Sequence, residues 1–388
     1  MYLLVRPYIK PRPDQDPDAF LGPRLTGFAD SVILDLRRTL RTGRPPKALL
    51  WGDFGVGKTH LTRFAMKQLG DAVKSLYVEC PPCHRRSRYT ELHAEIMRKL
   101  GREYTLGLVE RAARENPDVH RLADMIGIDA DMAGTLKAGL VADRALLWRY
   151  LGGEKLRASD LQKIDAVSPL IREGDAVAFL GAVSRLVRKY ENRQLLIFLD
   201  EMERPNPLVG DSLTLFKEAI RGLVDSSNET GVVFVSSGRD VNNTGNYSSA
   251  VRALADDTIR RRIGLANIRY FDQYSRKELV ELLREIVKHN REKGSDVQAA
   301  IRSVKTKETL EPDTYPFTGE ALEKAADFVE QLRRDSKIDS VRPNEALDIL
   351  DGALALAAEE EPKIIDSAFL QKVIRETLSR APAPKVEA

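Results

Sequence analysis

The feature that most constrains the fold is the stretch GDFGVGKT at residues 52–59. Its spacing, G-x-x-x-x-G-K-T, stands between the apolar run PKALLW and the helical pattern THLTRFAMKQLG. Glycines let backbone N–H groups wrap a phosphate, and the start of the following helix adds a dipole that favours negative charge. Between a strand and a helix, this motif predicts a nucleoside triphosphate site rather than a chance glycine turn.

Two side chains of this loop carry the phosphate chemistry. We expect Lys58 to neutralise the β- and γ-phosphates of ATP, and the Thr59 hydroxyl to hold Mg²⁺. ATP and Mg²⁺ are therefore the expected cofactors. The other residues expected to line the nucleotide are Gly52, Asp53, Phe54, Gly55, Val56, Gly57 and His60.

A second apolar run, LLIFLDE at residues 195–201, predicts a buried strand of a parallel sheet. Asp200 ends this strand at the carboxyl edge of the sheet, where it can reach the shell of the Mg²⁺ ion. Glu201 follows directly and is placed to orient or deprotonate the attacking water. The pair predicts hydrolysis rather than binding alone. The alternative is a solvated Asp–Glu pair at a strand end.

Two further stretches offer polar groups to the same nucleotide. The strand pattern GVVFVSSG ends in serines, of which Ser237 is the first choice and Ser236 the second for contacting the γ-phosphate or the water. The alternative is ordinary strand-end serines. A planar guanidinium suits a developing phosphoryl charge, so we expect at least one arginine of a predicted helix end to reach the ATP of a neighbouring subunit. The candidates, which also fit a solvated basic turn or a nucleic-acid patch, are Arg260, Arg261 and Arg262.

The order of apolar and helical patterns predicts the architecture. Strands alternating with helices indicate an α/β fold with a doubly wound parallel sheet, covered on both faces. From Lys58 to Asp200 is 200 − 58 = 142 positions, far more than one strand–helix unit needs, so residues about 103–190 form a helical insertion. Four later helical patterns predict a C-terminal all-α lid domain. The expected order is an extended N-terminal arm (1–20), the nucleotide-binding domain (21–274), the lid (275–380) and a disordered tail (381–388).

The motifs together resemble a known family. GDFGVGKT, LLIFLDE, the polar end of the next strand and IRRRIG followed by IRYFDQYSRKELVELLRE are similar to AAA+ ATPases. The segments AFLGPRLTGFADSVILDLRRTL and LYVECPPCHRRSRYTELHAEIMRKLG resemble its initiator clade, that is, origin-recognition-type replication initiators, with transposition-regulator ATPases nearby. The resemblance covers roughly residues 18–380 with a gap. It implies an AAA+ P-loop fold whose ATP site is completed between the subunits of a ring or spiral.

Two residue roles follow from the resemblance alone. The clade's arginine finger precedes a hydrophobic–glycine pair, which by position is Arg262 in RRIG. Its sensor-2 arginine would fall at Asn344 in VRPNEALDIL, whereas the available arginine is Arg342. Within the insertion, LLWRYLGGEKLRASDLQKIDAV resembles the segment before the acidic strand motif in P-loop ATPases of bacterial phage-exclusion systems. Its apolar spacing fits plain core packing as easily.

The stretch ECPPCHRRSRYTELH leaves its chemistry open. A zinc site, a redox pair and a plain loop all fit its four potential ligands, Cys80, Cys83, His84 and His93. A basic loop beside them is expected either to touch DNA phosphates or to lie solvated. It consists of Arg85, Arg86 and Arg88.

Net charge, the length of the apolar runs and the N-terminal segment bear on the partners and the location of the protein. The chain has 61 Lys and Arg against 58 Asp and Glu, and a formal net charge of +3 does not by itself indicate nucleic-acid binding. No apolar run in the sequence approaches the ~20 residues that span a membrane. The N-terminus MYLLVRPYIKPRPDQD does not fit a signal peptide. We therefore expect a cytoplasmic protein with no membrane partner.

The expected function is ATP hydrolysis at the intersubunit site of a homo-oligomer that engages DNA, as an initiator- or transposition-regulator-like factor. An alternative is an ATP-switched scaffold, in phage defence for example, that recruits or restrains a protein effector through the helical insertion. A third is a P-loop protein that binds ATP as a monomer for signalling.

Overall fold

The structure is a computed structural model that describes residues 3–4, 6–18, 23–81, 89–168, 173–204, 211–225, 229–238, 254, 256–292, 294–335 and 341–380. The chain divides into two compact units. The first comprises residues 1–30, 53–64 and 271–388, and the second comprises residues 31–52 and 65–270.

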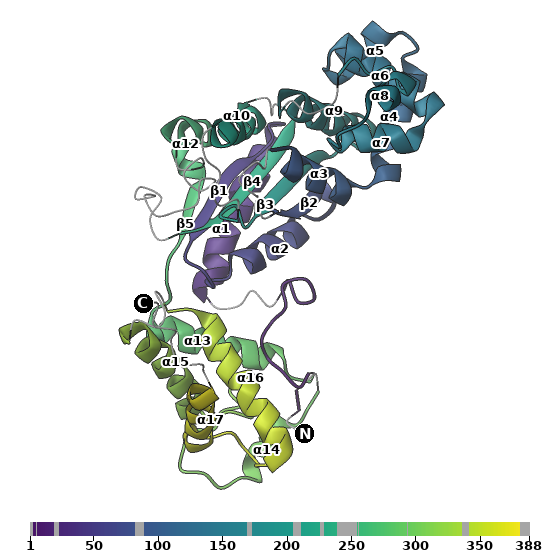
Figure 1. Ribbon diagram of the computed structural model, residues 1–388. Coiled ribbons are helices and arrows are strands. Elements are labelled where there is room, and N and C mark those ends of the chain that lie inside the picture. Colours follow the sequence, from purple (N-terminus) through teal and green to yellow (C-terminus); the bar gives the residue numbers. More distant parts are fainter. Residues whose placement is uncertain are drawn as a thin grey trace. The chain divides into compact units, whose positions relative to one another are not determined.

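A five-stranded sheet forms the centre of the second unit (Figure 1). The spatial order of the strands is β2-β3-β4-β1-β5, and the pairs β2–β3, β3–β4 and β4–β1 are parallel. Parallel neighbours need a crossover connection, which is why helices separate the strands along the chain. The predicted α/β fold with a parallel sheet is confirmed. The strands are β1 (Lys47–Gly52), β2 (Val73–Glu79), β3 (Gln194–Asp200), β4 (Thr230–Ser237) and β5 (Ile268–Phe271).

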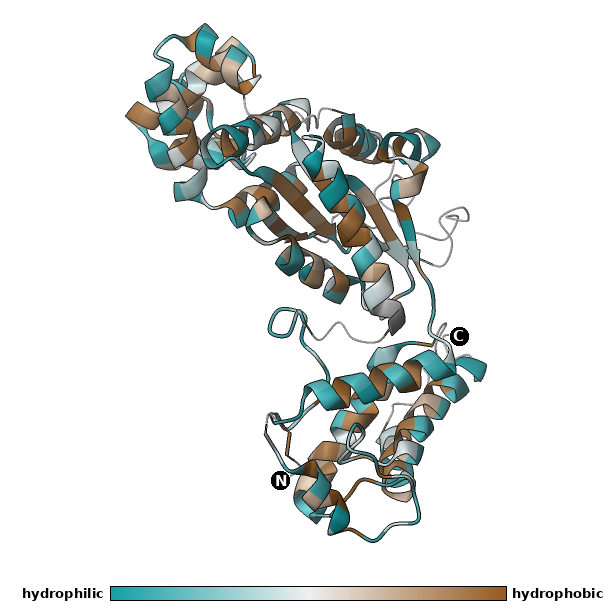
Figure 2. Cartoon of the chain, turned by 180° about the vertical axis from the view of Figure 1, so that it is seen from behind, coloured by the Kyte–Doolittle hydropathy of each residue, from teal (hydrophilic) through white to brown (hydrophobic). Residues whose placement is uncertain are grey.

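Strand β1 is buried on both sides because its side chains alternate between two helical layers. Leu49 and Trp51 join one large core cluster with helices that pack on β2, β3, β4 and β1. Leu50 faces the opposite way and lies with Val32 of α1 (Pro23–Arg41) around a small cavity. Figure 2 shows the strands as a hydrophobic band. Burial on both faces explains why these strands are unbroken apolar runs. The helices of the core cluster that pack on these strands are α3 (Tyr89–Leu100), α9 (Glu173–Glu191), α10 (Asp211–Asp225) and α12 (Asp257–Ile263).

A helical body stands between α3 and β3 in the chain, in the region where the sequence predicts an insertion. Helix α9 belongs to both parts, because it contacts α4 and α5 as well as β3 and β4. Aspartates begin three of the helices: Asp118, Asp129 and Asp143 each accept a backbone N–H of the first turn. Such caps satisfy N–H groups that have no partner within the helix. The body contains α4 (Arg102–Glu115), α5 (Val119–Ile126), α6 (Ala130–Ala142), α7 (Arg144–Leu151) and α8 (Ala158–Lys163).

The C-terminal part of the first unit is an all-helical bundle. Its first helix starts with a capping box, in which Ser275 and Glu278 each bond the backbone of the other. The predicted helices are present, and the structure adds the six-residue α14. Among the described residues, no helix is both long enough and apolar enough to cross a bilayer. The bundle consists of α13 (Arg276–His289), α14 (Val297–Arg302), α15 (Gly319–Arg334), α16 (Pro343–Glu360) and α17 (Ser367–Arg380).

The N-terminal arm packs on this bundle. Ile9 is fully buried, its N–H donates to Asp351 Oδ1 at 2.6 Å, and its carbonyl accepts from Asn290 Nδ2 at 3.1 Å. Lys10 adds an exposed ion pair with Asp348 at 2.6 Å. The arm is therefore held by backbone bonds to α16 and to the residue that follows α13.

We expect Asp351→Ala to release the arm. The change leaves the buried N–H of Ile9 without its acceptor, which costs about 1–3 kcal/mol. Hydrogen exchange at Ile9 and Lys10 should rise, and the free energy of unfolding should fall. The matched control is Asp348→Ala, because an exposed ion pair contributes only about 0–1 kcal/mol. Equal exchange in the two variants would contradict the assignment.

Candidate nucleotide-binding site

Residues 53–57 connect β1 to α2 (Lys58–Leu69), and the loop needs glycine at two places. Gly55 has φ +75° and Gly57 has φ +98°, a region that residues with a Cβ avoid. A Cβ on Gly55 would also come within 2.9 Å of Arg342 Cδ. The motif therefore forms a tight backbone turn that ends at a helix N-terminus, which is the geometry that suits an anion.

Lys58 is the first residue of α2, and its side chain is buried. It is 7 % exposed, its Nζ donates to the Asp53 carbonyl at 2.6 Å, and the ammonium lies 6.0 Å from the centre of the Phe54 ring. Burying an ammonium is costly unless charge or hydrogen bonds compensate it. A negatively charged phosphate would supply that compensation. The buried lysine and the two positive-φ glycines thus fit the triphosphate of ATP.

His60 takes a different place from the other loop residues. It is 8 % exposed and hydrogen-bonds the backbone of Asp16 and Pro17. Burial lowers the pKa of His60, and these hydrogen bonds oppose that shift. The structure therefore places the ring of His60 against the N-terminal arm.

Three residues that follow the sheet in the sequence support the loop. Gln273 Nε2 donates to Asp53 Oδ2 at 2.7 Å, and the Tyr274 hydroxyl donates to the Val56 carbonyl at 3.3 Å. Arg342 precedes α16 and lays its aliphatic stem against Gly55. Asn344, where the resemblance would place that arginine, is exposed on the first turn of α16. Sequence patterns did not single out Gln273 and Tyr274, because the contacts depend on the fold.

The acidic pair ends β3. Asp200 is 2 % exposed, its Oδ2 accepts from the Tyr77 hydroxyl at 2.8 Å, and its Oδ1 accepts from the N–H of Glu201 at 2.8 Å. Glu201 has φ +56°, a conformation that costs about 1–3 kcal/mol outside glycine and often marks a functional turn. Its carboxylate pairs with Arg204. Burial raises the pKa of Glu201, and Arg204 opposes the shift.

The serine pair ends β4, and a glutamate holds it. Ser237 is in register with Gly52 of β1, and its N–H donates to Glu203 at 3.0 Å. The Ser236 hydroxyl donates to the same carboxylate oxygen at 3.4 Å. Glu203 was not predicted from the sequence. Hard oxygen groups therefore gather at the carboxyl edge of the sheet, and Mg²⁺ prefers such ligands.

The three arginines form the last turn of α12. Arg260 pairs with Asp257 at 3.5 Å, and Arg262 Nε lies 2.6 Å from Asp225 Oδ1. Arg261 is exposed and has no ion pair within the described part of the chain. The three arginines therefore lie in different environments: Arg260 and Arg262 each pair with an aspartate, and Arg261 is exposed.

The cysteine–histidine stretch is only partly described. Cys80 is buried beyond the end of β2. His93 is buried in the core, where its ring contacts the Leu151 carbonyl at 2.8 Å and burial lowers its pKa to about 4. Within the described ranges, no group of three or more His, Cys, Asp or Glu residues could hold a metal ion. The predicted residues outside the described ones are Cys83, His84, Arg85, Arg86 and Arg88.

Several solved structures are similar to this one. The ORC2 protein of Aeropyrum pernix, in its ADPNP–ADP complexes, is 15 % identical with a TM-score of 0.50, and the alignment covers 92 % of this chain and 68 % of that one. Cdc6p from Pyrobaculum aerophilum is 16 % identical, with a TM-score of 0.48 and coverages of 95 % and 74 %. Drosophila ORC bound to DNA is 14 % identical, with a TM-score of 0.46 and coverages of 95 % and 66 %. At 15 % identity and a TM-score of 0.50, the likeness to the Aeropyrum pernix ORC2 protein shows a shared fold and nothing more.

Comparison by sequence gives the family. No curated protein matches the chain. Residues 31–235, which make up more than half of the 388 residues, match the family model of the AAA ATPase domain. The matched range includes both the glycine loop and the acidic pair that ends β3. The chain belongs to the AAA ATPase domain family.

Proposed function

We propose that this protein hydrolyses ATP and that the active site is completed by a second copy of the chain. The observation that carries the proposal is the buried ammonium of Lys58, at the first residue of a helix and after a loop with two positive-φ glycines. A phosphate beside that ammonium would add a negative charge that favours its burial. The family and the acidic pair of β3 support a triphosphate with Mg²⁺.

Each residue of the two motifs then has a separate task. Bound Mg²⁺ would neutralise negative charge that develops on the phosphates. Lys58 balances the charge of the β- and γ-phosphates, while Thr59 and Asp200 offer oxygen ligands to the ion. The Glu201 carboxylate accepts a proton from the attacking water. Ser237 is proposed to hold the γ-phosphate or the water, and Arg342 to contact the nucleotide.

Arg262 is proposed to act on the ATP of a neighbouring copy. It lines a hollow together with Lys47, the first residue of β1. The glycine loop follows Gly52, the last residue of that strand. A six-residue strand spans about 16 Å between its first and last Cα atoms. This separation supports a role for Arg262 outside its own nucleotide site, hence in a homo-oligomer.

The pH dependence of hydrolysis tests the role of Glu201, because the charge of Arg204 affects the pKa of Glu201. A positive neighbour favours the carboxylate, so Arg204→Ala raises the pKa of Glu201 further. A base must be deprotonated to work, and the acid limb of the hydrolysis profile should therefore move to higher pH, by about one pH unit. Arg204→Lys keeps the charge and serves as the control. An unmoved limb, or a shift to lower pH, would show that Glu201 is not the titrating base.

We propose that the ATPase acts on DNA, because its sequence resembles those of replication initiators. A specific observation favours the alternative of a protein effector. Two valines are largely exposed: Val141 of α6 is 90 % exposed, and Val167, which follows α8, is 80 % exposed. Titration with DNA in the presence of ATP separates the two. DNA engagement predicts stimulated hydrolysis and binding that falls steeply with salt. A flat response to duplex and single-stranded DNA would leave the effector scaffold as the better account.

A further inference from the structure

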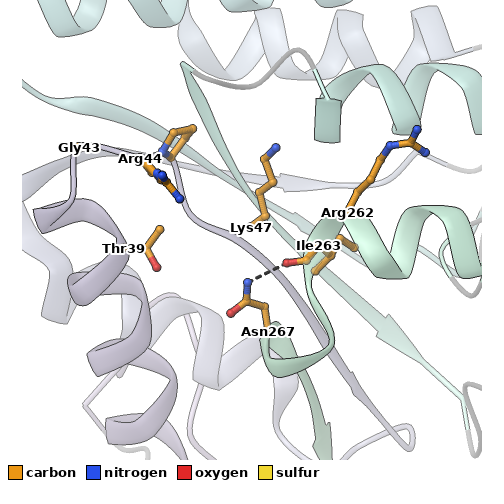
Figure 3. Close-up of a pocket in the computed structure, with 8 residues that line it drawn as sticks. Thr39, Gly43, Arg44, Lys47, Arg262, Ile263 and Asn267 are labelled. Atoms are coloured by element: carbon orange, nitrogen blue, oxygen red, sulfur yellow. Dashed lines mark hydrogen bonds between the residues drawn. The ribbon is translucent and has the colours of Figure 1, made fainter.

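A hollow of about 530 Å³ lies at the amino end of β1, a volume within the range of small-ligand sites. Figure 3 shows Thr39, Gly43 and Arg44 on one side, Arg262, Ile263 and Asn267 on the other, and Lys47 between them. Three of the described lining residues carry a positive charge, and no acidic residue is among them.

The positive charge around this hollow exceeds the negative charge. Asp225 is shared, because Arg262 Nε approaches one of its oxygens at 2.6 Å and Arg221 Nε approaches the other at 3.5 Å. Arg44 is exposed and has no ion pair among the described residues. Arg262 Nη1 is buried and lacks a hydrogen-bond partner in the described structure. A concave site with unbalanced cations attracts an anion.

An anion in the hollow would stabilise the charged form of Lys47. Burial lowers its pKa, and Asp225 only partly opposes the shift. Its ammonium donates to the Val224 carbonyl, a neutral group. A second negative charge beside it would favour the ammonium form.

The walls of the hollow are held before any ligand arrives. The Gly43 carbonyl accepts from Gln194 Nε2 at 3.0 Å and from Arg188 Nη1 at 3.3 Å. On the opposite wall, Asn267 Nδ2 donates to the Ile263 carbonyl at 2.7 Å. Walls that are formed in advance lower the cost of reorganisation when a ligand binds.

The hollow and the glycine loop lie at opposite ends of β1. The length of β1, about 16 Å from Lys47 to Gly52, separates the hollow from the strand end that leads into the chain's own glycine loop. We infer that Arg44 and Lys47, together with Arg262, receive the triphosphate of an ATP bound to a second copy of this chain. The inference rests on the proposed function, and it adds Arg44, which precedes β1, and Lys47, the first residue of β1, to the neighbour's nucleotide site.

The test uses Arg44→Glu, since Arg44 is exposed and substitutions at exposed positions usually change stability little. Arg41→Glu is the matched control, an exposed arginine in the last turn of α1 that does not line the hollow. Affinity for a fluorescent ATP analogue is measured in dilute protein, and assembly and hydrolysis are measured at high protein concentration. We expect Arg44→Glu to keep the affinity within twofold, to need about tenfold more protein to assemble, and to lose about tenfold in hydrolysis. Arg44→Lys should recover part of both losses, and Arg41→Glu should match the parent.

Each other outcome has a definite meaning. If the parent binds no ATP analogue, the proposed function itself fails. If the parent binds ATP and Arg44→Glu assembles and hydrolyses like Arg41→Glu, the inference is overturned while the ATP site stands. A dilute Lys58→Ala variant that still binds ATP through Arg44 would show that the hollow takes free nucleotide, which also overturns it. Loss of DNA binding alone in Arg44→Glu would overturn it in favour of a nucleic-acid surface.

Discussion

Lys58→Ala is expected to abolish ATP binding at micromolar concentration and to lower hydrolysis by at least ~100-fold, the scale of losing one preorganised charged group in a buried site. Lys58 is 7 % exposed, and its ammonium donates to the Asp53 carbonyl of the glycine loop. Removing it takes away the charge that balances the β- and γ-phosphates in the proposed site. Isothermal titration with an ATP analogue and a phosphate-release assay measure the two losses.

The same variant makes a second prediction about stability. Because a buried ammonium pays a desolvation cost, Lys58→Ala should melt at the same temperature as the parent or higher, in the absence of nucleotide. The control is Lys99→Ala, an exposed helical lysine in α3. It should keep both binding and hydrolysis. Normal ATP affinity in Lys58→Ala, or a melting temperature far below that of the parent, would contradict the assigned role.

Glu201→Gln is expected to separate binding from chemistry. Glutamine keeps the shape of the side chain but cannot accept the proton of the attacking water, so hydrolysis should fall by about 10²–10⁴-fold. ATP affinity should stay within a few-fold of the parent. As the nucleotide is not consumed, ATP-dependent assemblies should persist for longer than those of the parent.

Single-turnover hydrolysis and sedimentation in ATP measure these two effects of Glu201→Gln. Glu91→Gln, at an exposed position in α3, is the control for a lost carboxylate. It should hydrolyse and sediment like the parent. Near-parental turnover in Glu201→Gln would remove Glu201 from the chemistry and leave Asp200 or a water chain as the base.

Local sequence patterns predicted the elements that depend on backbone conformation and on the periodicity of apolar residues. The glycine loop was predictable because φ values of +75° and +98° demand glycine within a strand–loop–helix segment. The strands were predictable because burial on both faces requires unbroken apolar runs, as in LLIFLDE. The helical lid followed from its periodic apolar positions, although α14 was too short for such a pattern.

Contacts between distant segments were not predictable in this way. Tyr77 binds Asp200 only because β2 and β3 pair in parallel register, 123 positions apart in the chain. Asp225 meets Arg262 only because α10 and α12 pack together. The resemblance pointed to Asn344 for the lid arginine, while the structure brings Arg342 against Gly55. In each case the sequence contains both residues but does not show that they are in contact.

The central claim, an ATP site shared between two copies, is tested most directly by mixing two inactive variants. Lys58→Ala lacks the phosphate lysine but keeps Arg262, and Arg262→Ala lacks the arginine but keeps Lys58. We predict that each alone hydrolyses ATP at least about tenfold more slowly than the parent. In an equimolar mixture, about a quarter of the interfaces would join an intact loop to an intact Arg262, and hydrolysis should rise toward about a quarter of the parental rate. A mixture no more active than the mean of the two separate variants would contradict the claim.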